Sequence, residues 1–148
     1  NGHGGNVNSV KAAFSEILNE LAELRASSDR GVNKPPPDVR CALHNWWAGD
    51  KTTALRKSLY GDSEGYHATP SEVSVTWYAY PEQQRDVELG PLTKVKRAYQ
   101  GPEDYRELFP DGRMASDPSL ATPADGERLV SVAVTELAEN YREFLAES

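Results

Sequence analysis

The fold class is decided by one short stretch, VRCALHNWW, at Val39–Trp47. This stretch is mainly apolar and is bounded by turn residues, with three prolines before it at Pro35–Pro37. A short apolar run between turn residues is typical of a buried β-strand. The sequence therefore predicts a strand here, and the segments on either side decide what packs against it.

Three segments around the predicted strand have helical periodicity. Apolar residues recur every three or four positions over Val7–Leu24 and over Ala124–Ala146, which predicts two long amphipathic helices. Asp50–Leu59 is predicted as a shorter helix that ends at Gly61. Helices that alternate with strands indicate an α/β domain built in layers.

The remaining segments are less regular. Thr69–Tyr80 fits a strand or a helix by periodicity, and its first four residues, TPSE, favour a helix because they match a capping box with Pro at the first helical position. Ser27–Asp38 is predicted as a surface connection. Leu89–Tyr99 is predicted to be extended, and Gly101–Pro123 to be mostly loop.

Length and composition limit the function classes. The 148 residues predict one domain, and 16 Lys and Arg against 23 Asp and Glu give a net charge of −7. This charge argues against general affinity for nucleic acid or for an anionic membrane. The single cysteine, Cys41, cannot form an intrachain disulfide, and no apolar run reaches the roughly 18 residues of a membrane span. We therefore expect a cytoplasmic domain.

The glycine-rich hexapeptide NGHGGN at Asn1–Asn6 is the first candidate site. Its glycines leave the backbone free to approach a ligand, and the N–H groups at the start of the next helix point back at it. His3 is able to bind a metal ion or to transfer a proton. The alternative is a turn before a helix in which His3 has no function.

The second candidate site lies at Gly65–Glu72. His67 stands just before the predicted helix, where catalytic groups are frequent, and imidazole suits acid–base catalysis near neutral pH. Glu72 is able to bind a cation, or it completes the capping box and has no other role. Tyr66, beside His67, is expected to contact a substrate.

The third candidate site is the end of the predicted strand, at His44–Trp47. Ligands in open α/β sheets bind beyond the carboxyl ends of the strands. The indole rings of Trp46 and Trp47 are able to wall a pocket for a flat, polar substrate, or they pack in the core. All three histidines of the sequence lie in these three candidate sites.

These segments resemble the creatininase (creatinine amidohydrolase) family. Asn1–Asn6 followed by an amphipathic helix is similar to the family's signature, and His67–Ser74 is similar to its His-Ala-Gly-x-x-Glu-Thr-Ser block. Asp117–Thr122 resembles the family's closing segment. The resemblance covers nearly the whole chain.

The resemblance implies a metal-dependent amidohydrolase with a three-layer α/β/α fold, assembled into oligomers, often hexamers. Such an enzyme hydrolyses a non-peptide C–N bond in a small cyclic or formyl amide, with zinc, manganese or iron. By the same resemblance, His3 is a metal ligand, and Glu72 is a metal ligand or an orienting carboxylate. His67 is the catalytic histidine, which passes a proton to the leaving nitrogen. Trp46 or Trp47 corresponds to the aromatic wall of the substrate pocket.

The backbone N–H groups of Gly4, Gly5 and Asn6 are expected to bind the substrate by stabilising the oxyanion that develops on the amide. Gly5, however, stands where creatininase has a metal-binding Glu, and Thr69 and Pro70 also depart from the family pattern, which indicates a divergent branch.

The family's other ligands, a Glu, a His and an Asp, come from an N-terminal half. A divalent metal needs three or four protein ligands, and this chain offers two good ones. We therefore expect residues 1–148 to be the C-terminal part of a single creatininase-like domain. In this interpretation Asn1 is a new N-terminus made by cleavage, and the N-terminal part is retained as a partner chain.

Two alternatives belong to other functional classes. One is a non-catalytic module that holds an anionic metabolite at the Gly-rich loop and the helix N-terminus. The other is a structural subunit that keeps the fold while a partner carries the activity.

Overall fold

A computed structural model of the chain describes residues 1–29, 31, 34, 36–92, 94–95 and 97–147. The chain divides into two compact units, and each is described by itself. The first unit contains Asn1–Trp46 and Arg142–Ser148, and the second contains Trp47–Tyr141. That the whole chain is part of one larger domain stays a prediction.

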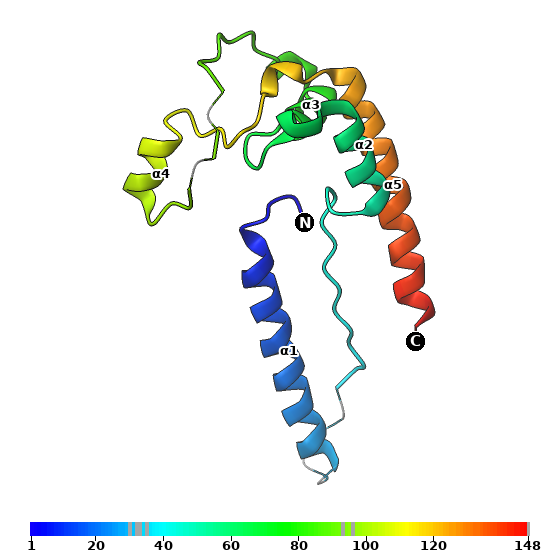
Figure 1. The fold of residues 1–148 in the computed structure, drawn as a ribbon. Coiled ribbons are helices and arrows are strands. Elements are labelled where there is room, and N and C mark those ends of the chain that lie inside the picture. The colour runs from blue at the N-terminus through cyan, green and yellow to red at the C-terminus, as the bar shows by residue number, and fades with distance from the viewer. Residues whose placement is uncertain (30, 32–33, 35, 93, 96, 148) are drawn as a thin grey trace. The chain divides into compact units, whose positions relative to one another are not determined.

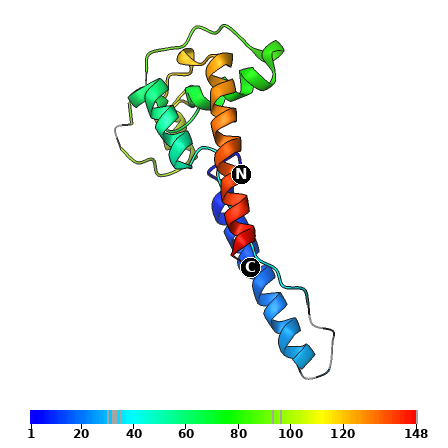
Figure 2. The same ribbon diagram turned by 90° about the vertical axis from the view of Figure 1, so that its right-hand side faces the viewer.

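The first unit is built on a long helix, α1, at Asn6–Asp29. The helix confirms the periodicity of Val7–Leu24 and continues beyond it, so the predicted connection at Ser27–Asp38 begins as helix. The chain then returns beside α1 as an extended segment, which Arg25 and Asp38 tie to the helix with an ion pair of 3.0 Å (Figures 1 and 2). None of the described residues of this unit is fully buried.

The segment predicted as a strand is extended but does not belong to a sheet. Along residues 39–45 half-buried and exposed side chains alternate, which is the two-residue period of a strand. A strand also needs a ladder of backbone hydrogen bonds to a neighbour. Here the Asn1 α-amino group donates to the His44 carbonyl at 2.8 Å, and the Trp46 amide donates to the Asn1 carbonyl at 3.4 Å. Two bonds to one residue make no ladder, so the strand prediction at Val39–Trp47 is wrong.

The second unit is helical. Its helices are α2 at Asp50–Tyr60, α3 at Pro70–Ala79, α4 at Pro102–Leu108 and α5 at Pro123–Ala146, whose last residues belong to the first unit. Short 3₁₀ turns lie at Gly61–Glu64, Pro81–Gln83 and Pro118–Leu120. The predicted helices at Asp50–Leu59, Thr69–Tyr80 and Ala124–Ala146 are confirmed.

Two segments were predicted as extended or as mostly loop. In Gly101–Pro123, which was predicted as mostly loop, the first residues after Gly101 form α4, with Pro102 at its first position and acidic residues in its first turn. The described residues of Leu89–Tyr99 form neither helix nor strand.

The second unit packs through small and polar side chains. Gly126 of α5 lies against α3 so closely that a Cβ atom there would be 2.0 Å from the Ser74 carbonyl oxygen. The buried Ser74 hydroxyl hydrogen bonds with the Tyr60 hydroxyl at 2.9 Å and accepts from the Thr122 amide at 3.0 Å. Leu129 and Ala133 of α5 are buried beside them. These contacts join α3 to both α2 and α5 (Figure 1).

The predicted three-layer α/β/α fold is not confirmed. Within the described ranges the chain forms helices and one isolated antiparallel bridge, between His67 and Met114. The segment at 39–45 has the side-chain pattern of a strand, but no neighbouring strand in these ranges pairs with it.

Candidate functional site

The second unit presents His67 and Tyr66 on an exposed loop between α2 and α3. Both side chains are exposed, Tyr66 to 77%. Two hydrogen bonds to Met114 fix the backbone of this loop. The Tyr66 amide donates to the Met114 carbonyl at 2.9 Å, and the Met114 amide donates to the His67 carbonyl at 3.4 Å. An exposed imidazole on a fixed backbone is suited to meet a substrate and to move a proton.

Glu72 forms the capping box that the sequence predicted as one of its two roles. The Thr69 hydroxyl accepts from the Glu72 amide at 3.2 Å, and Glu72 Oε2 accepts from the Thr69 amide at 3.0 Å and from the Thr69 hydroxyl at 3.0 Å. Oε1 takes no part in the capping box. The structural role of Glu72 is therefore confirmed, and its role as a metal ligand stays a prediction.

A buried ion pair joins this loop to Trp47. Arg56 of α2 lies 2.7 Å from Glu64, and its guanidinium also donates to the Trp47 carbonyl at 3.0 Å. Glu64 is only 7% exposed and accepts from the Ser71 hydroxyl at 2.5 Å. The pair thus connects Trp47, the end of the 61–64 turn and the start of α3.

The first unit holds the other predicted residues. The His3 side chain is exposed, and its Nδ1 atom accepts from the Gly5 amide at 3.0 Å, while its carbonyl accepts from the Asn6 amide at 3.1 Å. Asn1 joins this loop to the end of the extended segment, through the Asn45 side chain at 2.9 Å and the Trp46 amide. The structure therefore brings the first candidate site and Trp46 together.

The predicted oxyanion-binding amides are largely occupied in this arrangement. The Gly5 and Asn6 amides both donate to His3, and the Gly4 amide takes part in neither bond. Their proposed contact with a substrate would require His3 to release them. Gly5 also lies close to the imidazole, since a Cβ atom there would be 3.0 Å from the His3 ring.

Comparison with protein families decides the relationship. The model of the family described as creatininase, creatinine amidohydrolase, matches residues 1–141. The chain belongs to the creatininase family. A search of curated proteins finds no significant match. Membership in the creatininase family indicates a hydrolase of the amidohydrolase type.

Creatininase-family proteins are generally metal-dependent, but the site residues of this chain do not form a metal site by themselves. A metal-binding histidine coordinates through one ring nitrogen and usually donates the N–H of the other. Here His3 Nδ1 already accepts the Gly5 amide, so a neutral ring carries its proton on Nε2. Across the described residues no three His, Cys, Asp or Glu side chains gather in a metal-binding group.

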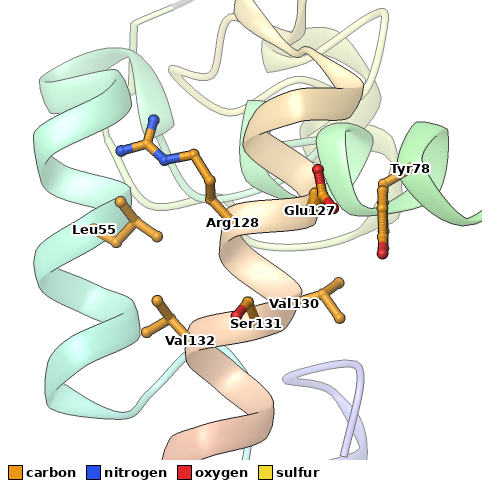
Figure 3. Close-up of a pocket in the computed structure, with 7 residues that line it drawn as sticks. All are labelled: Leu55, Tyr78, Glu127, Arg128, Val130, Ser131 and Val132. Carbon is orange, nitrogen blue, oxygen red and sulfur yellow. The ribbon is translucent and has the colours of Figure 1, made fainter.

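One surface pocket of this creatininase-family chain lies away from the predicted site residues. It is an open surface pocket of about 630 Å³, lined by residues of α2, α3 and α5 (Figure 3). Its one cation, Arg128, pairs with Asp125 at 3.0 Å, and none of the predicted site residues lines it. This pocket gives no support to a substrate site.

Sequence reasoning missed the residues that hold the loop of His67. Arg56, Glu64 and Met114 are far apart in the sequence and belong to no motif noted above. The nearest signal was the resemblance of Asp117–Thr122 to a family segment, because its first residue, Asp117, donates its amide to the Ser63 carbonyl.

No helix in the described ranges is both long enough and apolar enough to span a bilayer.

Proposed function

We propose that this chain is the C-terminal part of a metal-dependent amidohydrolase that cleaves a non-peptide C–N bond in a small cyclic or formyl amide. The family match over residues 1–141 carries the proposal. The exposed His67 on a fixed loop supports it, because amide hydrolysis needs a group that delivers a proton to the leaving nitrogen.

His67 is the proton-transfer group in this proposal. An imidazole is a side-chain group suited to acid–base catalysis near neutral pH. Tyr66 stands next to it with an exposed side chain, and Trp47 is connected to the same loop through Arg56 and Glu64. These aromatic side chains are the proposed contacts for the planar amide.

The metal site in this proposal is shared with a partner chain that supplies the N-terminal part of the domain. His3 and Glu72 are the ligands proposed on this side, and His3 binds the metal once its Nδ1 atom releases the Gly5 amide. Two ligands are fewer than the three or four protein ligands that a divalent metal takes. The shortage of ligands in this chain supports a second contributor. Zinc, manganese and iron are the proposed metals, and a cytoplasmic hexamer is the proposed assembly.

The experiment uses the assembled protein with its partner chain. Release of product from creatinine, a small lactam and an N-formylamine is measured for the wild type and for His67→Ala, His3→Ala and Gln83→Ala. Gln83 is the control, because its side chain is exposed and it lies outside the three candidate sites. We expect His67→Ala and His3→Ala to lose activity and Gln83→Ala to retain it.

Wild-type turnover in His67→Ala would sink the catalytic assignment. Metal analysis of the same preparations tests the shared site, since loss of the bound metal in His3→Ala is expected. An assembly that holds no stoichiometric divalent metal and hydrolyses none of the three amides would favour a non-catalytic binding module instead.

A further inference from the structure

The loop that carries His67 lies in direct backbone contact with a distant segment, residues 114–117. Gly65 is the point of closest approach. A Cβ atom at Gly65 would be 2.4 Å from the Ser116 amide nitrogen and 2.5 Å from the Met114 carbonyl oxygen, shorter than contacts of real Cβ atoms. Its φ of +62° is also in the left-handed region that favours glycine. Only glycine therefore allows the two segments to lie this close.

Side-chain and backbone hydrogen bonds close the contact on both sides of Gly65. The hydroxyl of Ser116, which has no exposed surface, donates to the His67 carbonyl. The Asp117 amide donates to the Ser63 carbonyl at 2.8 Å. Residues 114–117 thus bond to the loop before Gly65 and after it, and the backbone at His67 has little freedom to move.

The backbone on each side of the bridge is strained. Ala68, directly after His67, has a φ of +53°, and Ala115, directly after Met114, has a φ of +56°. Residues other than glycine rarely adopt this left-handed conformation. Such strain persists where the surrounding structure enforces it, and it is concentrated at functional sites.

We propose that Gly65 and Ser116 are positioning residues for His67: Gly65 admits the 114–117 backbone, and the Ser116 hydroxyl fixes the carbonyl of His67. The inference rests on the proposed role of His67 in proton transfer. A displacement of a catalytic group by about 1 Å lowers the rate by up to about 100-fold. Residues that touch no substrate thereby control the rate of the chemical step.

The test compares two disruptive variants with matched controls. Gly65→Ala adds a backbone clash and the strain of a side chain at positive φ. Gly61→Ala and Gly112→Ala add only the strain, because their φ angles are +52° and +81° and no atom lies within 4 Å of the Cβ atom that Ala would add. Ser116→Ala removes the buried hydroxyl, and Ser119→Ala removes an exposed one. The free energy of unfolding is measured for all five variants.

The first readout is the imidazole region of the NMR spectrum of the assembled protein labelled at histidine. The sequence has three histidines, and comparison with His67→Ala identifies the His67 signals. Gly65→Ala and Ser116→Ala are expected to shift or broaden the His67 signals. The control variants are expected to leave the His67 signals unchanged.

The second readout is the steady-state rate with whichever of creatinine, the lactam and the N-formylamine the wild type hydrolyses. We expect kcat to fall at least about tenfold in Gly65→Ala and Ser116→Ala, with KM within about twofold, because positioning acts on the chemical step. If Gly65→Ala does not fold, Ser116→Ala decides the question.

Wild-type His67 signals and control-level kcat in Ser116→Ala would overturn the positioning role. A wild type that hydrolyses none of the three amides would count against the proposed function instead. In that case the NMR comparison still decides whether Gly65 and Ser116 fix His67.

Discussion

Glu136 of α5 stabilises the start of α2, although it lies 84 residues from Thr52 in the sequence. Its Oε1 atom accepts from the Lys51 amide at 2.9 Å, and its Oε2 atom accepts from the Thr52 amide at 3.2 Å and the Thr52 hydroxyl at 2.9 Å. These two amides are unpaired at a helix N-terminus and are normally satisfied by the residue before the helix. That residue is Gly49, which has no side chain to supply the bond.

We predict that Glu136→Ala lowers the free energy of unfolding by about 3 kcal/mol. Loss of a helix cap costs about 1 kcal/mol, and a buried hydroxyl left without its partner costs about 1–3 kcal/mol more. Thr52 has no exposed surface, so water does not replace the lost acceptor. The melting temperature is then expected to fall by roughly 6–12 °C for a protein of this size.

The assay is urea denaturation followed by circular dichroism, with Glu139→Ala as the control. Glu139 lies one turn further along α5 and pairs with the Lys51 ammonium, and these side chains are 44% and 55% exposed. An exposed ion pair contributes at most about 1 kcal/mol. Equal losses in Glu136→Ala and Glu139→Ala would refute the idea that Glu136 caps α2.

The pH dependence gives a second check on the same residue. Burial acts to raise the pKa of Glu136, but hydrogen bonds from the Lys51 and Thr52 amides and the Thr52 hydroxyl outweigh it and lower the pKa below its usual 4.5. A carboxyl group whose pKa is lower in the folded state than in the unfolded state stabilises the fold when the pH is above its unfolded-state pKa. This stabilisation is lost as the pH falls through the folded-state pKa. The loss of unfolding free energy in Glu136→Gln relative to the wild type should therefore be constant above about pH 6 and shrink below pH 4.5. A loss that persists undiminished at low pH would contradict this expectation.

Three further predictions concern other contacts. Gly126→Ala is expected to cost about 1–3 kcal/mol in urea denaturation, in spite of the better helix propensity of Ala, because the new Cβ would lie 2.0 Å from the Ser74 carbonyl oxygen. Asp104 is expected to titrate in NMR with a pKa of about 2, and Arg97→Gln to return it toward 3.8, because the Arg97 guanidinium hydrogen bond is the main cause of the shift. Ala68→Val is expected to lose more than about 1 kcal/mol of unfolding free energy while Ala68→Gly holds or gains it, because the φ of +53° suits glycine and excludes a β-branched side chain.

The sequence predicted the elements whose causes are local. Thr69 and Glu72 are three residues apart, so the capping box that starts α3 could be recognised without the rest of the chain. Gly61 ends α2 for a similar reason, since its φ of +52° favours glycine and its amide donates to the Lys57 carbonyl at the last turn. The periodicity of α1 and α5 also needs only neighbouring residues.

The prediction failed where the cause is distant. Residues 39–45 have the alternating exposure of a strand, but a strand forms only when another backbone supplies its hydrogen bonds. The positioning of His67 by Ser116, 49 residues away, depends on a tertiary contact that no local pattern encodes. The site was therefore predicted as a set of residue types and not as an arrangement in space.

The buried polar residues link the stability of the second unit to its candidate site. Among the described residues the buried polar side chains outnumber the buried apolar ones, and Glu64, Ser71 and Ser116 lie on both sides of the His67 loop. Hydrogen bonds between buried side chains restrict these residues to one geometry, and Glu64 makes its bonds through Oε1 while its buried Oε2 has no hydrogen-bond partner in the described part of the chain. A substitution in this set is therefore expected to change the geometry of His67 and the free energy of unfolding together. Effects on activity are accordingly assigned to His67 only when they exceed those of a control variant with the same loss of stability.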